Sequence, residues 1–114
     1  MAIVNITVEN DADFYQAFQY QTVSGAPINI TGATLWMMLR RHAQDDTALM
    51  RLGSDTGEIV LTDPVNGLFT IYIAQIELAR LGLGEYDHSL IMGVGTYKHG
   101  IWTGTFTNNP GASR

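Results

Sequence analysis

The sequence predicts an all-β protein: an antiparallel, immunoglobulin-like β-sandwich of about seven to nine short strands with one short crossover helix. Three observations support this. Apolar and polar residues alternate along short segments rich in β-branched and aromatic side chains. Turn-forming Gly, Pro, Asn and Asp residues separate these segments at regular intervals. Helical spacing occurs only over residues 74–81.

The first two strands are predicted over residues 3–8 and 14–21, where side chains alternate in character. The acidic segment 10–13 forms a turn between them. Residues 24–27 end the second strand, because glycine permits a positive φ and proline fixes its own φ. A short edge segment follows at residues 28–30.

The third strand, residues 33–41, is apolar on both faces at its centre. One face holds Ala33, Leu35, Met37 and Leu39, and the other holds Thr34, Trp36, Met38 and Arg40. Only one face can pack on the core of a sandwich, so the second is covered either by another segment of this chain or by another subunit. Trp and Met are favoured at interface centres and unusual in an exposed patch. We therefore predict that Trp36, Met38 and Arg40 form an interface.

The middle of the chain continues the β pattern. Residues 42–47 form a polar loop, and short strands at 49–52 and 59–61 flank a turn at 53–57. The Asn-Gly pair at 66–67 is a hairpin signal. The strand at 68–73 then places Phe69, Ile71 and Ile73 on one face.

The helix predicted at residues 74–81 has Ile76, Ala79 and Arg80 at helical spacing. Because it is about two turns long, it is too short to stand alone and is interpreted as a crossover between strands. Gly82 and Gly84 end it.

Two strands complete the domain. The first, residues 85–94, carries Tyr86, His88, Leu90 and Met92 on one face, and a turn is predicted at 98–100. The strand at 101–107 places Trp102, Gly104 and Phe106 together. A chain of 114 residues suits one domain, predicted over 1–108, with a flexible tail at 109–114.

Composition narrows the function classes. The chain is 46% hydrophobic and 15% charged, which indicates an ordered globule. It has no cysteine, which excludes disulfides and thiolate chemistry and fits a reducing compartment. With a net charge of −5 and thinly spread basic residues, neither nucleic acid nor an anionic membrane is an expected partner. The N-terminus lacks a signal-peptide pattern, and the longest apolar run, residues 35–39, is too short to span a bilayer.

Candidate chemistry is sparse. His42 lies near Asp45 and Asp46 but in one polar loop, which is better interpreted as solvated. His88 shares a face with core residues, and His99 lies in a predicted turn. No nucleophile elbow, phosphate-binding loop or metal-ligand spacing is present. We therefore predict a protein that is not an enzyme and has no cofactor and no metal.

The order of several motifs resembles a known family. Residues 25–33, Gly-Ala-Pro-Ile-Asn-Ile-Thr-Gly-Ala, are similar to a G-x-P-I-D-L-T-G-A segment of small phage and prophage tail-associated proteins, which include the N-terminal β-sandwich domain of baseplate upper proteins. Similar segments follow at 57–61, 67–73, 84–86 and 104–107. The sequence departs from the family pattern at three positions: Asn29, His88 and Ser89.

This resemblance implies a virion component of a phage tail or baseplate, made in the bacterial cytoplasm and acting through protein–protein contacts. Its implied partners are other tail or baseplate proteins, and homo-oligomers are a further possibility. The residues leave open a second function, a carbohydrate- or ligand-binding sandwich, since sugars stack on exposed aromatic rings. The candidate platforms for that function are Tyr15, Tyr72, Tyr97 and Trp102.

Overall fold

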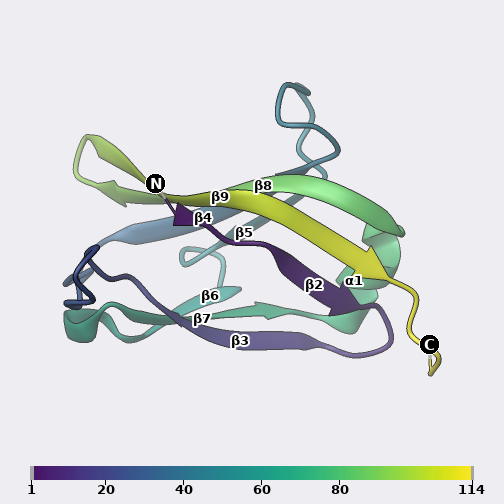
Figure 1. Cartoon of the computed structure of the whole chain (residues 1–114), viewed down its shortest axis with the longest axis horizontal. Coiled ribbons are helices and arrows are strands. Elements are labelled where there is room, and N and C mark those ends of the chain that lie inside the picture. Colours follow the sequence, from purple (N-terminus) through teal and green to yellow (C-terminus); the bar gives the residue numbers. More distant parts are fainter. Residues whose placement is uncertain (1, 114) are drawn as a thin grey trace.

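The computed structural model describes residues 2–113 and arranges nine strands in two packed sheets (Figure 1). The first sheet has six strands. Strand β9 is flanked on one side by β1 and β2 and on the other by β8, followed by β4 and β5. The bounds of these strands are β1 Ala2–Ile3, β2 Ile6–Glu9, β4 Thr34–Arg40, β5 Met50–Gly53, β8 Gly84–Val94 and β9 Tyr97–Asn109. The second sheet has three, in the order β3 Phe14–Gln19, β7 Leu68–Ile73 and β6 Ile59–Asp63. The predicted all-β sandwich is confirmed.

The N-terminal strand differs from the prediction in continuity and direction. It is broken at residues 4–5, and both β1 and β2 run parallel to β9, so the sandwich is not antiparallel throughout. At the break, the Asn5 Oδ1 atom accepts hydrogen bonds from the Thr105 backbone N–H at 3.1 Å and from its hydroxyl at 3.2 Å. A side chain therefore replaces a backbone partner where the strand is interrupted.

Two local predictions are wrong, and a third is correct but incomplete. Residues 28–30 form no strand; instead Ile30 is buried, and its N–H donates to the Pro64 carbonyl, in the 3₁₀ turn Pro64–Asn66. The turn predicted at 98–100 lies at 95–96, and residues 98–100 belong to β9. The segments at 49–52 and 59–61 are strands but lie in opposite sheets, so the turn between them crosses the sandwich. Local composition does not record which sheet a strand joins.

The core lies between the sheets and is built from the faces that alternation predicted. Its fully buried side chains come from both sheets, among them Leu35, Met37, Leu39, Phe69, Ile71, Tyr86, Leu90 and Phe106. Alternation fails at one place in β9, where Ile101 and Trp102 are both buried. The register between β8 and β9 shifts there by one residue, and such a bulge places two neighbouring side chains on the same side.

The crossover helix α1, Gln75–Leu81, links β7 to β8 and closes one end of the sandwich (Figure 1). Its buried residue is Leu78. Ile76, the apolar residue singled out from the helical spacing, is instead about half exposed. Asn108 Nδ2 donates to the carbonyls of Leu78 at 2.8 Å and Gly82 at 2.9 Å, which satisfies acceptors at the helix end. No helix in residues 2–113 is long and apolar enough to cross a membrane.

Asn108→Asp is expected to lower the free energy of unfolding by about 2 kcal/mol, because a carboxylate cannot donate to two carbonyls. Asn108 is 1% exposed, so water cannot replace the lost donors. Urea unfolding followed by tryptophan fluorescence measures the change. The matched control is Asn109→Asp on the same strand, where we expect a small effect; equal midpoints for the two variants would contradict the proposed helix-end role.

The segment after β9 contacts the start of the chain. The backbone N–H of Gly111 donates to Asn10 Oδ1 at 2.9 Å, and that of Ser113 donates to Asp11 Oδ2 at 3.2 Å. Strand β9 itself ends at Asn109, one residue beyond the predicted domain boundary. The division into a domain at 1–108 and a flexible tail at 109–114 stays a prediction.

Candidate interface

The predicted interface residues lie on the outer face of the six-stranded sheet. Along β4, Leu35, Met37 and Leu39 are fully buried, whereas the intervening Trp36, Met38 and Arg40 are half-buried. The three-stranded sheet packs on the opposite face (Figure 1). The second apolar face of this strand therefore has no sheet over it.

Trp36 lies against the neighbouring strand β8. A Cβ atom at Gly93 would be 2.8 Å from Cζ3 of the indole, so glycine at this position makes room for the ring. The Lys98 ammonium lies 6.0 Å from the centroid of the Trp36 ring, at the outer limit of a cation–π contact. Trp36 is thus held between a glycine backbone and a long basic side chain.

Arg40 joins the other end of this face to the loop at residues 41–49, which stands out from the sheet in Figure 1. Its Nη1 atom donates to the Asp45 carbonyl at 3.0 Å, and its Nη2 atom contacts the Met38 sulfur at 3.7 Å. The Ala43 N–H donates to Asp87 Oδ2 at 2.9 Å, which ties the loop to β8. Loop and sheet together form a hollow of about 520 Å³, lined among others by Trp36, Met38, Arg40, Ala43, Asp87 and Ile91.

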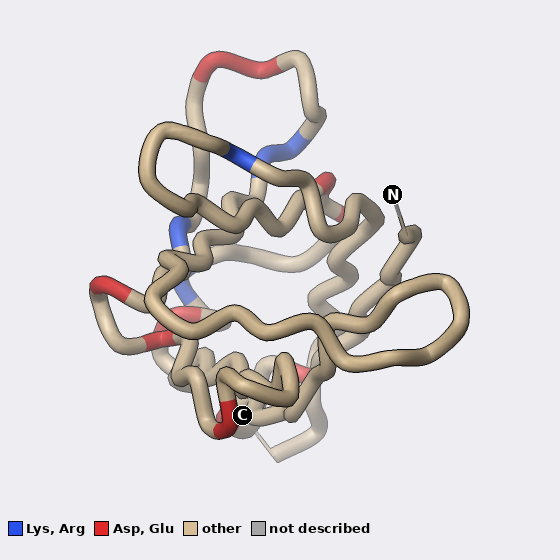
Figure 2. Tube along the Cα trace, turned by 90° about the vertical axis from the view of Figure 1, so that its left-hand side faces the viewer, with Lys and Arg blue, Asp and Glu red and all other residues tan. Residues whose placement is uncertain are grey.

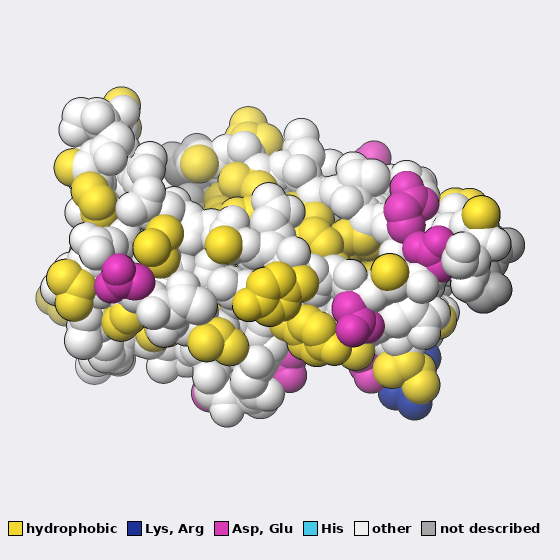
Figure 3. Space-filling view, turned by 90° about the horizontal axis from the view of Figure 1, so that it is seen from below, with side chains coloured by type: hydrophobic (Ala, Val, Ile, Leu, Met, Phe, Trp, Pro, Cys, Tyr) yellow, Lys and Arg dark blue, Asp and Glu magenta, His cyan; other side chains and the backbone are white. Residues whose placement is uncertain are grey.

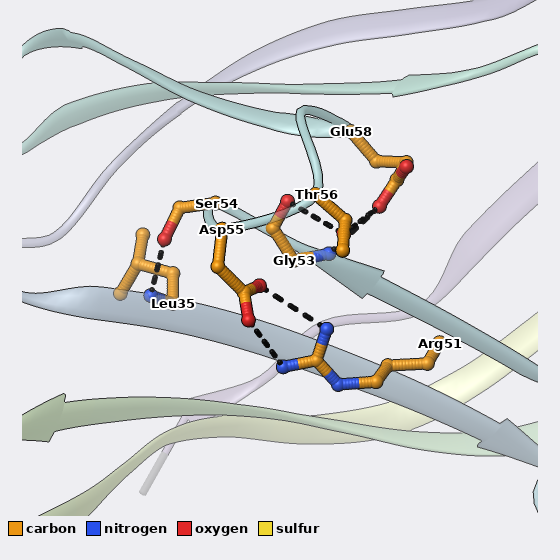
Figure 4. Close-up of polar contacts among 7 residues, drawn as sticks. All are labelled: Leu35, Arg51, Gly53, Ser54, Asp55, Thr56 and Glu58. Carbon is orange, nitrogen blue, oxygen red and sulfur yellow. Dashed lines mark hydrogen bonds and ion pairs between the residues drawn. The ribbon is translucent and has the colours of Figure 1, made fainter.

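A turn at the edge of the same sheet is fixed by polar contacts (Figure 4). Arg51 is the cross-strand partner of Met38, so the two side chains share the outer face. Its guanidinium donates to both carboxylate oxygens of Asp55, at 3.1 and 3.3 Å, and this hydrogen bonding lowers the pKa of Asp55. Ser54 Oγ accepts from the Leu35 N–H at 2.9 Å. The edge of the face is therefore ordered.

Basic residues gather at this face although the chain is acidic. Arg40, Arg51 and Lys98 are three of the five Lys and Arg residues in 2–113. Figure 2 shows Lys and Arg positions in its upper and middle parts, whereas Asp and Glu occur from top to bottom. A half-buried Trp–Met pair rimmed by Arg and Lys has the composition of an interaction surface.

The other predicted residues have structural explanations. His42 and Asp45 bond to each other's backbone in a tight turn, and residues 2–113 hold no group of three side chains suited to a metal ion. Trp102 is 5% exposed and packs on Phe18, so it cannot serve as a sugar platform.

On the outer face of the three-stranded sheet, Tyr15 and Tyr72 are exposed and pack edge to face, 6.3 Å between ring centroids. Figure 3 shows hydrophobic side chains gathered over this face, with acidic groups around them.

His88 occupies the core, as its strand face predicted. Its Nε2 atom lies 3.0 Å from the Val4 carbonyl and 3.1 Å from that of Thr105, and the Trp102 indole N–H donates to Nδ1 at 3.3 Å. Because Nδ1 accepts, Nε2 carries the proton and the ring is neutral. Burial lowers the pKa of His88, opposed by the two carbonyls and by Asp87.

The sequence did not reveal which neighbours complete the outer face. Asp87, Ile91 and Gly93 occupy alternate positions of β8, opposite its predicted core face. The sequence predicted that these residues share a face of β8. It did not predict that β8 pairs with β4, which is what places them beside Trp36 and Arg40.

A comparison with solved structures identifies a protein domain with the same fold. The N-terminal domain of phage TP901-1 ORF48 superposes with a TM-score of 0.55, over 93% of this chain and 85% of that one. The chain has the fold of a phage protein domain. Identity is 15%, so the likeness concerns the fold. No protein-family model matches the chain, and no curated protein matches it. The resemblance predicted from motif order is confirmed at this level.

Proposed function

We propose that this chain is a non-catalytic structural or assembly protein of a phage or prophage tail or baseplate. The observation that carries the proposal is the fold shared with a phage protein domain over 93% of the chain. The structure adds a candidate contact surface on the outer face of the six-stranded sheet. Its site of action would be the virion, after synthesis in the bacterial cytoplasm, and its partners would be other tail or baseplate proteins.

The outer face of the six-stranded sheet supports contact with a protein partner. Trp, Met and Arg are enriched in protein interfaces, and Trp and Arg are also enriched among the residues that contribute most of the binding energy. Trp36, Met38 and Arg40 are half-buried in the isolated chain, so a partner would remove their remaining apolar surface from water. The loop at 41–49 forms a wall beside them, which gives the surface a shape that a partner can match.

The direct test is the composition of purified phage particles from an induced, producing host. We expect mass spectrometry to detect the chain in a fixed ratio to tail proteins, and antibody–gold labelling to place it on the tail. Absence from particles, or a presence that washing in high salt removes, would contradict the proposal.

The double variant Trp36→Ala, Met38→Ala is expected to fold but to be lost from particles. Both side chains lie outside the core, so we expect the free energy of unfolding to fall by about 1–2 kcal/mol and no more. The matched control is Tyr15→Ala on the opposite sheet, which should be incorporated normally. If the double variant is unfolded, the pair belongs to the core; if it is incorporated fully, the interface lies elsewhere.

A further inference from the structure

Within residues 2–113, one edge of strand β9 has no neighbouring strand at its beginning. It starts at Tyr97, but its parallel neighbour β1 begins opposite Trp102. Residues 97–100 therefore pair with β8 on one side, Ile101 is the extra residue of the bulge, and no described residue forms a strand along the other side of 97–101. Such an edge presents a row of backbone N–H and C=O groups that can accept an added strand.

A cleft of about 820 Å³ opens beside this edge, larger than the hollow on the outer face. It lies between the start of β9, β1 and the segment at 20–28, and its lining includes Val4, Phe18, Tyr20, Ile28, Ile101 and Trp102. Phe18 and Trp102, with ring centroids 4.9 Å apart, belong to the aromatic cluster beneath it. Among the described residues, no Asp, Glu, Lys or Arg side chain lines the cleft. The Lys98 ammonium of β9 lies 6.0 Å from the centroid of the Trp36 ring, on the other face of the sheet.

Exposed apolar side chains occur on the cleft and on the strands beside it. Val23, which lines the cleft, is fully exposed. On the flanking strands, Ile3 of β1 is 77% exposed and Tyr97 at the start of β9 is 70% exposed, although neither lines the cleft. These residues come from three separate segments that meet at one end of the sandwich (Figure 1). Apolar side chains around an uncharged cleft are a signature of a binding surface.

We propose that the 97–101 edge of β9 and this cleft together accept an extended, uncharged segment of a partner protein as an added strand. The segment continues the position of β1 along β9, and its alternate apolar side chains enter the cleft. The backbone N–H and C=O groups along the edge of β9 can be paired by the backbone of an added strand. Because burying an unpaired charge is costly, a cleft with an uncharged lining favours uncharged side chains. A second copy of this chain is disfavoured by its net charge of −5, because like charges repel. This inference rests on the proposed assembly function.

The experiment titrates isotope-labelled protein with an acetylated, amidated octapeptide of alternating threonine and valine, followed by amide NMR. We expect saturable shifts at residues 97–101, at the Trp102 indole N–H and at the residues that line the cleft, such as Val23. A control peptide with proline at every threonine position lacks the backbone N–H donors of those positions, so it should bind roughly tenfold more weakly or not at all. A second control with glutamate in place of valine tests the requirement for uncharged side chains.

Val23→Asp is expected to weaken octapeptide binding roughly tenfold, because it places a charge on the rim. Val23 is fully exposed, so the melting temperature should not change. The matched control Ile76→Asp, exposed on α1 at the opposite end of the sandwich, should bind the octapeptide like the parent protein.

Three outcomes would overturn the proposal: shifts absent from 97–101, equal binding of the proline peptide, or equal binding by Val23→Asp. Light scattering without peptide gives a fourth, since a dimer that Val23→Asp converts to a monomer would identify the occupant as a second copy. Particle incorporation through Trp36 is measured separately, so failure here leaves the test of the proposed function intact.

Discussion

Gly104→Ala is expected to lower the free energy of unfolding by about 3–5 kcal/mol, enough to unfold a marginal domain. A Cβ atom at this position would lie 2.0 Å from the Val4 carbonyl oxygen and 2.7 Å from its carbonyl carbon. Both are backbone atoms, so no side-chain rotation relieves the overlap. The variant forces the break between β1 and β2 away from β9.

The displacement also breaks a buried polar contact. The Val4 carbonyl accepts from His88 Nε2 at 3.0 Å, and the Val4 N–H donates to the Thr103 carbonyl at 2.9 Å. Moving Val4 outward weakens both bonds and leaves His88 with one carbonyl in place of two. The expected loss therefore combines overpacking with an unsatisfied donor.

Urea unfolding followed by tryptophan fluorescence measures the effect of Gly104→Ala. Thr103→Ala, at the preceding and exposed position of β9, is the matched control and should cost less than about 1 kcal/mol. Equal unfolding midpoints for the two variants would show that Val4 can move at little cost, and would remove the close approach as the reason for glycine at 104.

The comparison of sequence with structure shows which information is local. Alternation predicted the buried and outer faces of β4, and it also placed His88 and Phe106 in the core. It could do so because a side chain's face depends on its own strand alone. The turn predicted at 98–100 was wrong because Gly100 belongs to a strand, while Gly95, with a φ of 58°, supplies the hairpin turn. A glycine's residue type does not reveal which of these roles it has.

The candidate interface has the same limit. Alternation placed Trp36, Met38 and Arg40 on one face of β4, and that face is the outer one. Their role as an interface stays a prediction. The hollow around them depends on the loop at 41–49 and on Asp87. The open edge of β9 depends on parallel pairing with β1, which the alternation pattern does not distinguish from antiparallel pairing. Features that require two distant segments to meet were therefore missed.

Protonation of His88 is expected to destabilise the fold in mildly acidic solution. The neutral ring donates from Nε2 to two carbonyls and accepts at Nδ1 from the Trp102 indole. A proton on Nδ1 would set two donors against each other in a site that is 5% exposed. Burial accordingly lowers the pKa of His88 in the folded protein, although both carbonyls and Asp87 oppose the shift.

The sign of the pH dependence follows from proton uptake. The unfolded chain titrates at the ordinary histidine pKa of about 6.5, whereas the folded chain titrates at a lower pH. Between the two pKa values the unfolded state binds the extra proton, so stability rises with pH in that window. The contribution of His88 is complete above the unfolded-state pKa. It declines as the pH falls below that value and stops declining below the folded-state pKa.

We expect the free energy of unfolding to decrease when the pH is lowered from about 7.5 to about 5.5, a range above the ordinary titration of carboxylates. Urea unfolding at closely spaced pH values measures the slope. His88→Gln should be less stable than the parent at pH 7.5 and should lose most of the slope, because the amide does not titrate. His42→Gln, in the exposed loop, is the matched control and should keep it. A slope that survives His88→Gln would mean that another group causes the pH dependence. Stability that rises as the pH falls would mean that His88 is charged in the folded core and that the assigned tautomer is wrong.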